Sequence, residues 1–331
     1  MSAQTTETTS EPFDPWAAPP GVPLSRKDLN ALKRRSDAPG LRFLAGHLAI
    51  IAMTGLVIFS ALRFGSWPLT LLAMLLHGSV MVFLFAPMHE CTHGTAFRRR
   101  WINSAVGTLC GFVLFRPALY FKWRHAAHHS YTQDPERDPD IIPMPENWGQ
   151  YLGELMGMRL WPKLVGTLYR GITGRFTDQE KEWIPETERG RVSREARLLL
   201  ASYTLVAVVS VALGSLVVVW YWLLPRTLAE PVLRMVRMVE HTGMDEGPDP
   251  MTNTRTTKPN PVVQFLYWNM PYHAEHHLAP SVPFHALPKM HAQLPVSEAP
   301  PSILRAHREI IRNIGKGNPS SVARRATGGL D

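Results

Sequence analysis

Two long apolar runs near the N-terminus constrain this chain more than any other feature of its sequence. Phe43–Leu62 is the first run, and Pro68–Met88, which contains no Lys, Arg, Asp or Glu, is the second. About 20 apolar residues in a helix reach across the hydrocarbon core of a bilayer. Because only the short segment 63–66 separates the two runs, the sequence predicts two membrane-spanning helices that form a hairpin.

Two further apolar stretches are less regular. Ser104–Phe121 is interrupted by Arg116–Pro117, a charge followed by a helix breaker, and we expect it to lie on the membrane surface or to re-enter without crossing. Arg197–Leu224 is long enough for one tilted helix or for two helices that break at Gly214–Ser215. We favour the break, with the second helix leading toward His241. The predicted fold is all-α and multi-pass, with about four transmembrane helices in two hairpins plus a cytoplasmic helical cap that carries the histidine clusters described below.

The basic residues gather beside the apolar runs. The chain has 35 Lys and Arg against 27 Asp and Glu, a net charge of +8. Lys33–Arg35 precede the first run and Arg98–Arg100 follow the second. Positive residues in these places are typical of the cytoplasmic side of a membrane protein. The distribution therefore explains the positive charge without a nucleic-acid partner.

The two ends of the chain differ in composition from the apolar part. Residues 1–25 carry Thr, Ser, Glu and several prolines with no packing period, and we expect a disordered N-terminal arm. Residues 26–299 contain the apolar runs and are expected to form one membrane-embedded domain. Residues 300–331 are basic, and we expect a mobile C-terminal tail.

Eight of the 14 histidines occur in three short clusters, each beside a predicted membrane boundary. The first cluster, HECTH, places two imidazoles at positions i and i+4, on one face of a helix. The other two, HAAHH and HAEHH, place histidines at i, i+3 and i+4. The candidate metal ligands are His89 and His93 in the first cluster, His125, His128 and His129 in the second, and His273, His276 and His277 in the third.

The number and spacing of these histidines indicate the kind of metal. Taken alone, HECTH is a zinc peptidase signature in which Glu90 acts as general base. Eight imidazoles exceed the needs of one four-coordinate zinc ion. Adjacent histidines on a helix diverge by about 100°, so that one helix can offer ligands to two ions. Two octahedral ions with open positions suit non-haem iron. A zinc membrane peptidase using His89, Glu90 and His93, and a metal-binding transporter, stay as alternatives.

The three clusters in this order resemble a known family. HECTHG, then HAAHH followed by SYTQDPERDPD, then HAEHH preceded by WNMPY, are similar to the histidine boxes of membrane fatty acid desaturases and hydroxylases, bacterial acyl-lipid desaturases in particular. The resemblance covers about residues 40–295. It implies a di-iron enzyme (Fe2+/Fe3+), with its active site at the cytoplasmic face, that uses O2 and two external electrons to desaturate an acyl chain. Members also hydroxylate acyl chains, alkanes and carotenoids, so hydroxylation stays an alternative.

We expect the electrons to come from another protein. The sequence has no HPGG motif of a fused cytochrome b5 domain, and its two cysteines are too few for an iron–sulfur centre. The expected partners are a ferredoxin or a cytochrome with its reductase, the lipid membrane, and a hydrophobic acyl substrate. Arg98–Arg100 either receive an acidic donor or simply flank the membrane.

Other residues near the clusters are candidates for supporting roles. The resemblance implies that His241, at the end of the predicted fourth span, is a ninth metal ligand. Glu90 and Glu275 are candidate catalytic side chains that we expect to accept hydrogen bonds from imidazole N–H groups. Asn269, one helical turn before His273, is a candidate for holding a metal-bound water.

The remaining polar residues have simpler expected roles. We expect His47 and His77, inside the first two runs, to pack as hydrogen-bonded neutral side chains. The acidic residues after the second cluster, which either orient histidines of the clusters or cap the loop, are Asp134, Asp138 and Asp140. The histidines after the third cluster, which we expect at the surface, are His285, His291 and His307.

Overall fold

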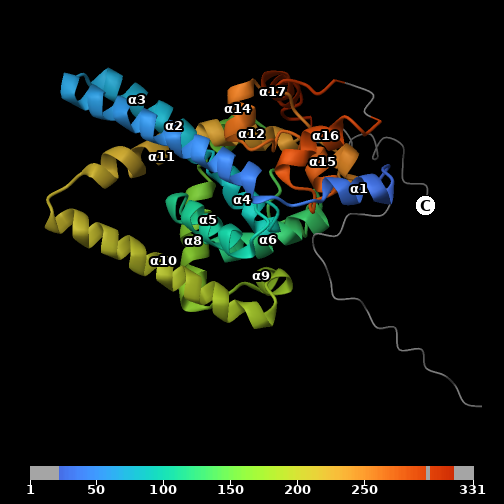
Figure 1. Ribbon diagram of the computed structural model, residues 1–331, viewed down its shortest axis with the longest axis horizontal. Coiled ribbons are helices and arrows are strands. Elements are labelled where there is room, and N and C mark those ends of the chain that lie inside the picture. The colour runs from blue at the N-terminus through green and yellow to red at the C-terminus, as the bar shows by residue number, and fades with distance from the viewer. Residues whose placement is uncertain (1–21, 296–298, 317–331) are drawn as a thin grey trace, which may run out of the picture.

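The first two apolar runs form a pair of long helices. The computed structural model describes residues 22–295 and 299–316, and these residues form helices and no β-strand. α2 (Asp37–Phe64) and α3 (Trp67–Val82) lie side by side (Figure 1). They are joined at Gly65, whose φ of +68° is one that glycine adopts without strain. After a short break, α4 (Phe85–His93) continues from α3. The prediction of an all-α fold is confirmed.

Among the described residues, three helical segments are long and apolar enough to cross a membrane: Asp37–Phe64, Trp67–His93 and Glu186–Ala212. A fourth is added if α5 (Arg100–Val113) and α6 (Ala118–Tyr131) count as one span, which is bent by 99°. The bend lies at Arg116–Pro117, as the sequence predicts, and Phe115 just before it has a φ of +60°. This stretch is therefore not a straight helix.

The predicted break at Gly214 is present. α10 (Glu186–Ala212) ends just before Gly214, whose φ is +57°. The chain then forms three short helices, namely the π-helix η1 (Val219–Leu223), α11 (Leu224–Leu228) and α12 (Glu230–His241). α11 and α12 pack against α3, so the end of α12 returns toward the first helices. α10 itself lies apart from α2 and α3 and packs against α8 (Figure 1).

Short helices complete the fold around the ends of α4, α6 and α12. They are α1 (Arg26–Leu32), α7 (Trp148–Leu155), α8 (Leu160–Thr173), α9 (Asp178–Trp183), α13 (Pro250–Asn253), α14 (Pro261–Leu266), α15 (His273–Leu278), the 3-10 helix η2 (Phe284–Ala286), α16 (Leu287–His291) and α17 (Ile303–Arg312). The main apolar core contains Phe85, Phe97, Leu233, Trp268 and Phe284, all fully buried. Because these side chains come from distant parts of the chain, their packing holds α4 and α15 in a defined relative position.

The C-terminal segment differs from the sequence prediction. α17 is an amphipathic helix that packs on α12. His307, expected at the surface, is buried, with Nδ1 3.1 Å from the Tyr151 hydroxyl oxygen and Nε2 2.8 Å from the Met235 carbonyl oxygen. The tail predicted from residue 300 thus begins with a packed helix, because its apolar residues recur on one face. Residues 1–21 of the predicted arm and 317–331 of the predicted tail lie outside the described residues.

Candidate metal centre

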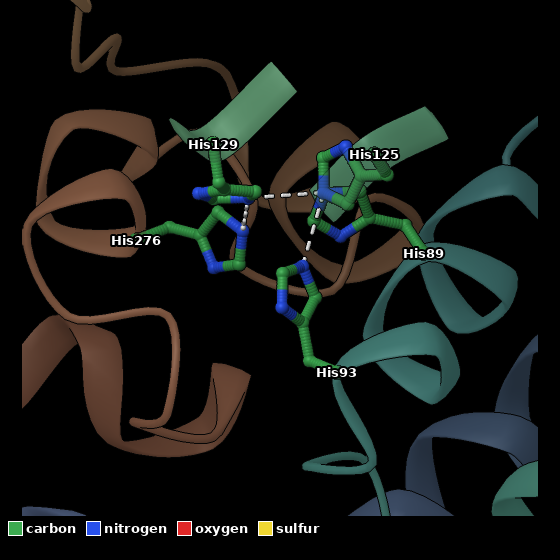
Figure 2. A group of neighbouring side chains, drawn as sticks. All are labelled: His89, His93, His125, His129 and His276. Atoms are coloured by element: carbon green, nitrogen blue, oxygen red, sulfur yellow. Dashed lines mark hydrogen bonds between the residues drawn. The ribbon is translucent and has the colours of Figure 1, made fainter. Parts of the chain in front are cut away.

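Nine histidines from four helices converge at the ends of α4, α6, α12 and α15. Eight of them are buried, and His129 is partly exposed. They form two groups, each with one nitrogen per histidine within 4.8 Å of the others in its group. The first group is His89, His93, His125, His129 and His276 (Figure 2), and the second is His128, His241, His273 and His277.

Each HxxHH box divides its histidines between the two groups. On α6, His128 enters the second group while its neighbours in the box enter the first; on α15, His276 enters the first group while the other two enter the second. Adjacent side chains on a helix point about 100° apart, which is the reason for this division. One helix therefore contributes to both groups, as the spacing of the box predicts.

The nitrogens of the first group are spaced as metal ligands are. Nε2 of His125 lies 3.0 Å from Nε2 of His93 and 3.0 Å from Nε2 of His129 (Figure 2). Nε2 of His276 lies 3.2 Å from Nε2 of His129. Two ligands about 2.1 Å from one ion, at right angles to each other, are about 3 Å apart. The first group therefore fits a single ion bound through Nε2 atoms.

The second group has the same geometry. Nε2 of His241 lies 3.3 Å from Nε2 of His128 and 3.1 Å from Nε2 of His273. Among the described residues, Nε2 of His277 and Nε2 of His89 have no hydrogen-bond partner although both atoms are buried. A buried imidazole nitrogen without a partner is unfavourable in a folded protein, and a metal ion would satisfy it. The donor set of both groups is imidazole only, which suits iron, copper, nickel or zinc rather than magnesium or calcium.

Asp138 orients one of these histidines. Its two carboxylate oxygens lie 2.9 and 3.0 Å from Nδ1 of His128, so Nδ1–H donates to the carboxylate and leaves Nε2 to bind a metal. The other two acidic residues of this loop have cationic partners instead, because Asp140 pairs with Arg124 and Asp134 with Arg137. Of the two roles that the sequence left open, orientation applies to Asp138.

Glu90 lies beside the first group. Its Oε2 accepts hydrogen bonds from Thr95 Oγ1 at 2.9 Å and from the backbone N–H of Phe284 at 3.2 Å. Its Oε1 is 3.8 Å from Nδ1 of His89 and 3.8 Å from Nδ1 of His276. The carboxylate thus faces the side of both imidazoles that is turned away from the metal position. At 3.8 Å neither contact is a hydrogen bond, so the role of Glu90 as an acceptor for imidazole N–H groups stays a prediction.

Glu275 and Asn269 are engaged away from the nine histidines. Glu275 accepts hydrogen bonds from Thr256 Oγ1 at 2.5 Å and from Nδ1 of His291 at 2.5 Å, so its imidazole partner lies outside its own box. The Asn269 amide donates to the Phe284 carbonyl and accepts from a glutamine, each at 3.3 Å. Asn269 has a φ of +56° and lies in a turn rather than in a helix, which is why its expected position one helical turn before His273 does not arise.

Sequence reasoning missed Glu240. Its Oε1 accepts a hydrogen bond from the Tyr267 hydroxyl at 2.7 Å, and its Oε2 lies 3.6 Å from Nε2 of His273 in the second group. Burial raises the pKa of Glu240 to about 7. Its position directly before the candidate ligand His241 is the sequence feature that could have pointed to it. The other acidic residue of the same helix, Glu230, pairs with arginines instead.

The two histidines inside the first helices are held by hydrogen bonds of the kind predicted. Nε2 of His47 lies 2.9 Å from the Val80 carbonyl oxygen. His77 lies 2.8 Å from Thr54 Oγ1 through Nδ1 and 3.1 Å from the Tyr221 carbonyl oxygen through Nε2. Both residues tie neighbouring helices together, and both lie outside the two histidine groups.

Comparisons with known proteins agree with this geometry. The sequence model of the family described as "Fatty acid desaturase" matches residues 65–305, a region that contains all nine histidines. Dihydrorhizobitoxine desaturase of Bradyrhizobium elkanii is 28% identical over 290 residues, which are 80% of this chain and 77% of that protein. An sn-1 oleoyl-lipid 12-desaturase of Picosynechococcus is 25% identical over 299 residues, 82% of this chain and 80% of that protein. The resemblance noted in the sequence is confirmed, and this chain belongs to the fatty acid desaturase family.

Proposed function

We propose that this protein is an O2-dependent membrane enzyme that introduces a double bond into a fatty acyl chain of a lipid. The observation that carries the proposal is the convergence of nine histidines into two adjacent groups, in a member of the fatty acid desaturase family. The overall reaction takes two hydrogens from the acyl chain and two electrons with two protons from a donor, and reduces O2 to two water molecules. Two bound iron ions would supply the activation of O2 and the attack on an unactivated C–H bond.

The residues of the chain hold and tune that centre. The first group offers five imidazoles and the second offers four, which leaves open positions on octahedral ions. Asp138 fixes the orientation of the His128 imidazole through Nδ1. Glu90 lies 3.8 Å from Nδ1 of His276, where a carboxylate would place negative charge next to ligands that are all neutral. A zinc peptidase of this signature would use only His89, Glu90 and His93. The seven histidines outside HECTH would have no purpose in a peptidase.

We propose four membrane spans in two hairpins, with the histidine groups at the cytoplasmic face. α2 and the α3–α4 segment would form the first hairpin, and α10 with the η1–α11 segment would form the second. The arginines 98–100 follow the first box directly, which supports the cytoplasmic assignment. The bent pair α5–α6 would enter the membrane surface and return, because an even number of crossings is needed for the boxes to meet.

The electron donor is proposed to be a separate ferredoxin, or a cytochrome, with its reductase. The exposed residues 98–100 lie close in sequence to His93 and carry three positive charges, which would favour an acidic partner.

Metal analysis combined with product analysis tests this function. The full chain, purified in detergent and reconstituted with Fe2+, is expected to hold about two iron ions per chain by mass spectrometry of the metal. With a reducing system and an oleoyl lipid under air, gas chromatography is expected to show a new double bond. His93→Ala should lose iron and product, whereas His285→Ala, outside both groups, should retain them. One zinc ion with proteolytic activity, or an alcohol as the sole product, would contradict the proposal.

A further inference from the structure

A strongly cationic pocket lies beside the metal centre and has no part in the function proposed above. Its volume is about 270 Å3, and it is bounded by α6, α7, α8, α12 and the loop after α6. Six basic and two acidic side chains line it, an excess of four positive charges. The basic residues are Arg116, Arg124, Arg159, Lys163, Arg234 and Arg237, and the acidic ones are Asp140 and Glu154.

Carboxylates neutralise only part of this charge. Arg124 pairs with Asp140 at 2.5 Å, and Arg159 pairs with Glu154 at 3.4 Å. Arg234 is bonded to Glu230 at 3.0 Å, but it shares this carboxylate with Arg226, which is 2.6 Å away, and Arg237 lies 4.0 Å from Glu240. No carboxylate among the described residues forms an ion pair with Arg116 or Lys163.

The burial of the Arg116 side chain beside the pocket is energetically unfavourable when no anion is bound. The residue is only 4% exposed, and its Nε has no hydrogen-bond partner among the described residues. A buried guanidinium with an unsatisfied donor is costly, and an anion in the pocket would remove that cost. The centroid of the Phe85 ring lies 5.4 Å from Arg116 Cζ and 4.6 Å from Arg237 Cζ. The guanidinium groups of Arg116 and Arg237, both of which line the pocket, thus lie near the same Phe85 ring.

The mouth of the pocket is also positive. Lys163 and Arg159 are exposed there, while Arg124, Arg234 and Arg237 have side chains no more than 12% exposed. Donors therefore reach the pocket from several helices and at several depths. A carboxylate is satisfied by one arginine fork, whereas the oxygens of a phosphate can accept from many directions at once. The arrangement favours a phosphate over a carboxylate.

A second, apolar cavity is lined by the residue that precedes Arg116 in the chain. Its volume is about 570 Å3, and Phe115, Tyr203 and Trp222 are among the residues that line it, between α10 and η1. Phe115 lines the apolar cavity, while the next residue in the chain, Arg116, lines the cationic pocket. A molecule with a phosphate at one end and an apolar chain at the other would fill both.

We propose that the cationic pocket binds the phosphate group of a glycerophospholipid, with an acyl chain of that lipid in the apolar cavity. None of the nine histidines lines the cationic pocket, although Arg237 lies 4.0 Å from Glu240, which is itself 3.6 Å from His273. The inference stands on charge, burial and cavity shape, and does not depend on the reaction at the metal groups.

Calorimetric titration of the full chain in non-ionic detergent micelles tests the inference. Phosphatidylglycerol added to the micelles should bind saturably, and diacylglycerol with the same acyl chains should not. A third titration, with inorganic phosphate, tests whether the pocket binds free phosphate rather than a lipid. We expect inorganic phosphate to bind more weakly than phosphatidylglycerol, because it has no apolar chain. Equal binding of phosphatidylglycerol and diacylglycerol would overturn the proposal.

A pair of lysine variants provides the matched control. Lys163→Met removes a charge at the pocket mouth and should weaken phosphatidylglycerol binding about tenfold or more, the loss expected for one charged hydrogen bond. Lys181→Met, on α9, removes the same charge from an exposed lysine outside the pocket and should leave binding unchanged. Arg116→Gln removes the buried guanidinium and should also weaken phosphatidylglycerol binding. Thermal unfolding shows whether this variant is folded. Wild-type affinity in Lys163→Met would overturn the proposal whether or not Arg116→Gln folds.

Discussion

His129 and His277 stack on one another, with ring centroids 4.1 Å apart and ring planes 21° apart. They come from different boxes and belong to different histidine groups, and their contact has the shortest centroid distance of several ring contacts between the two groups. These contacts hold the two histidine groups close together. Damage to the second group is therefore expected to affect activity even when the first group still holds its ion.

His241→Ala should reduce the iron content from about two ions per chain to about one. The substitution removes one of the four imidazoles of the second group and leaves the first group complete. Metal analysis of the purified variant, with product analysis beside it, measures the effect. His285→Ala is the control. Full iron content and full activity in His241→Ala would show that this histidine is not a ligand.

Asp138→Asn should weaken metal binding to the second group by about 10- to 100-fold, the usual effect of losing a carboxylate behind a histidine ligand. The asparagine oxygen can accept only one of the two backbone N–H bonds, because Gln133 donates to Oδ2 of Asp138 and Asp140 donates to Oδ1. Some stability should therefore be lost even without metal, and thermal unfolding of the metal-free variant measures that loss separately from the loss of metal affinity. Competition with a chelator measures the affinity. Asp134→Asn, which alters an exposed pair with Arg137, should keep wild-type affinity.

Activity should depend on an added electron donor. The purified chain with NADH or NADPH and O2 alone should form no product, because we expect the two electrons per turnover to come from a separate redox protein. A ferredoxin or cytochrome with its reductase should start turnover, and oxygen uptake should follow product formation. Turnover by the chain alone with NADH would reveal a cofactor site that we have not identified.

Gly78→Ala should destabilise the contact between α3 and α11. A Cβ built at Gly78 would lie 1.9 Å from the Pro225 carbonyl oxygen, and backbone there has little freedom to move. We expect a loss of about 1–3 kcal/mol in the free energy of unfolding, as for other overpacked sites. Gly190→Ala is the matched control, because a Cβ there meets no atom within 4 Å and the residue lies in the exposed helix α10. Thermal unfolding in detergent should show a lower midpoint for Gly78→Ala only.

Phosphatidylglycerol binding should weaken as the pH rises from about 7 to about 9. The charge of Arg124, together with partial burial, lowers the pKa of Lys163 to about 8, while Asp140 and Glu154 act in the opposite direction and Arg234 adds to the lowering. Above that pH the free protein has lost the lysine charge, whereas the lipid phosphate keeps its charge. Titrations at several pH values measure the trend. Lys163→Met should show a flat profile, and the same slope in both proteins would contradict the assignment to Lys163.

The sequence alone determined the features that depend on local chemistry. Apolar length predicts the long helices, Gly214 predicts the break after α10, and Arg116–Pro117 predicts the bend between α5 and α6. The spacing of HxxHH predicts that adjacent histidines diverge, because helix periodicity is a property of the backbone. These features need no knowledge of what packs against them.

Only the tertiary structure decided which groups meet. The spacing of the box separates His276 from His277, but it does not say which distant histidines each one joins; His129, whose Nε2 lies 3.2 Å from Nε2 of His276, belongs to another box. The same holds for the position of Glu240 near His273 and for the bond between Glu275 and His291. The cationic pocket likewise brings together Arg116, from the segment between α5 and α6, and Lys163, from α8. Contacts between distant segments follow from the packing of whole helices, and local sequence patterns do not encode that packing.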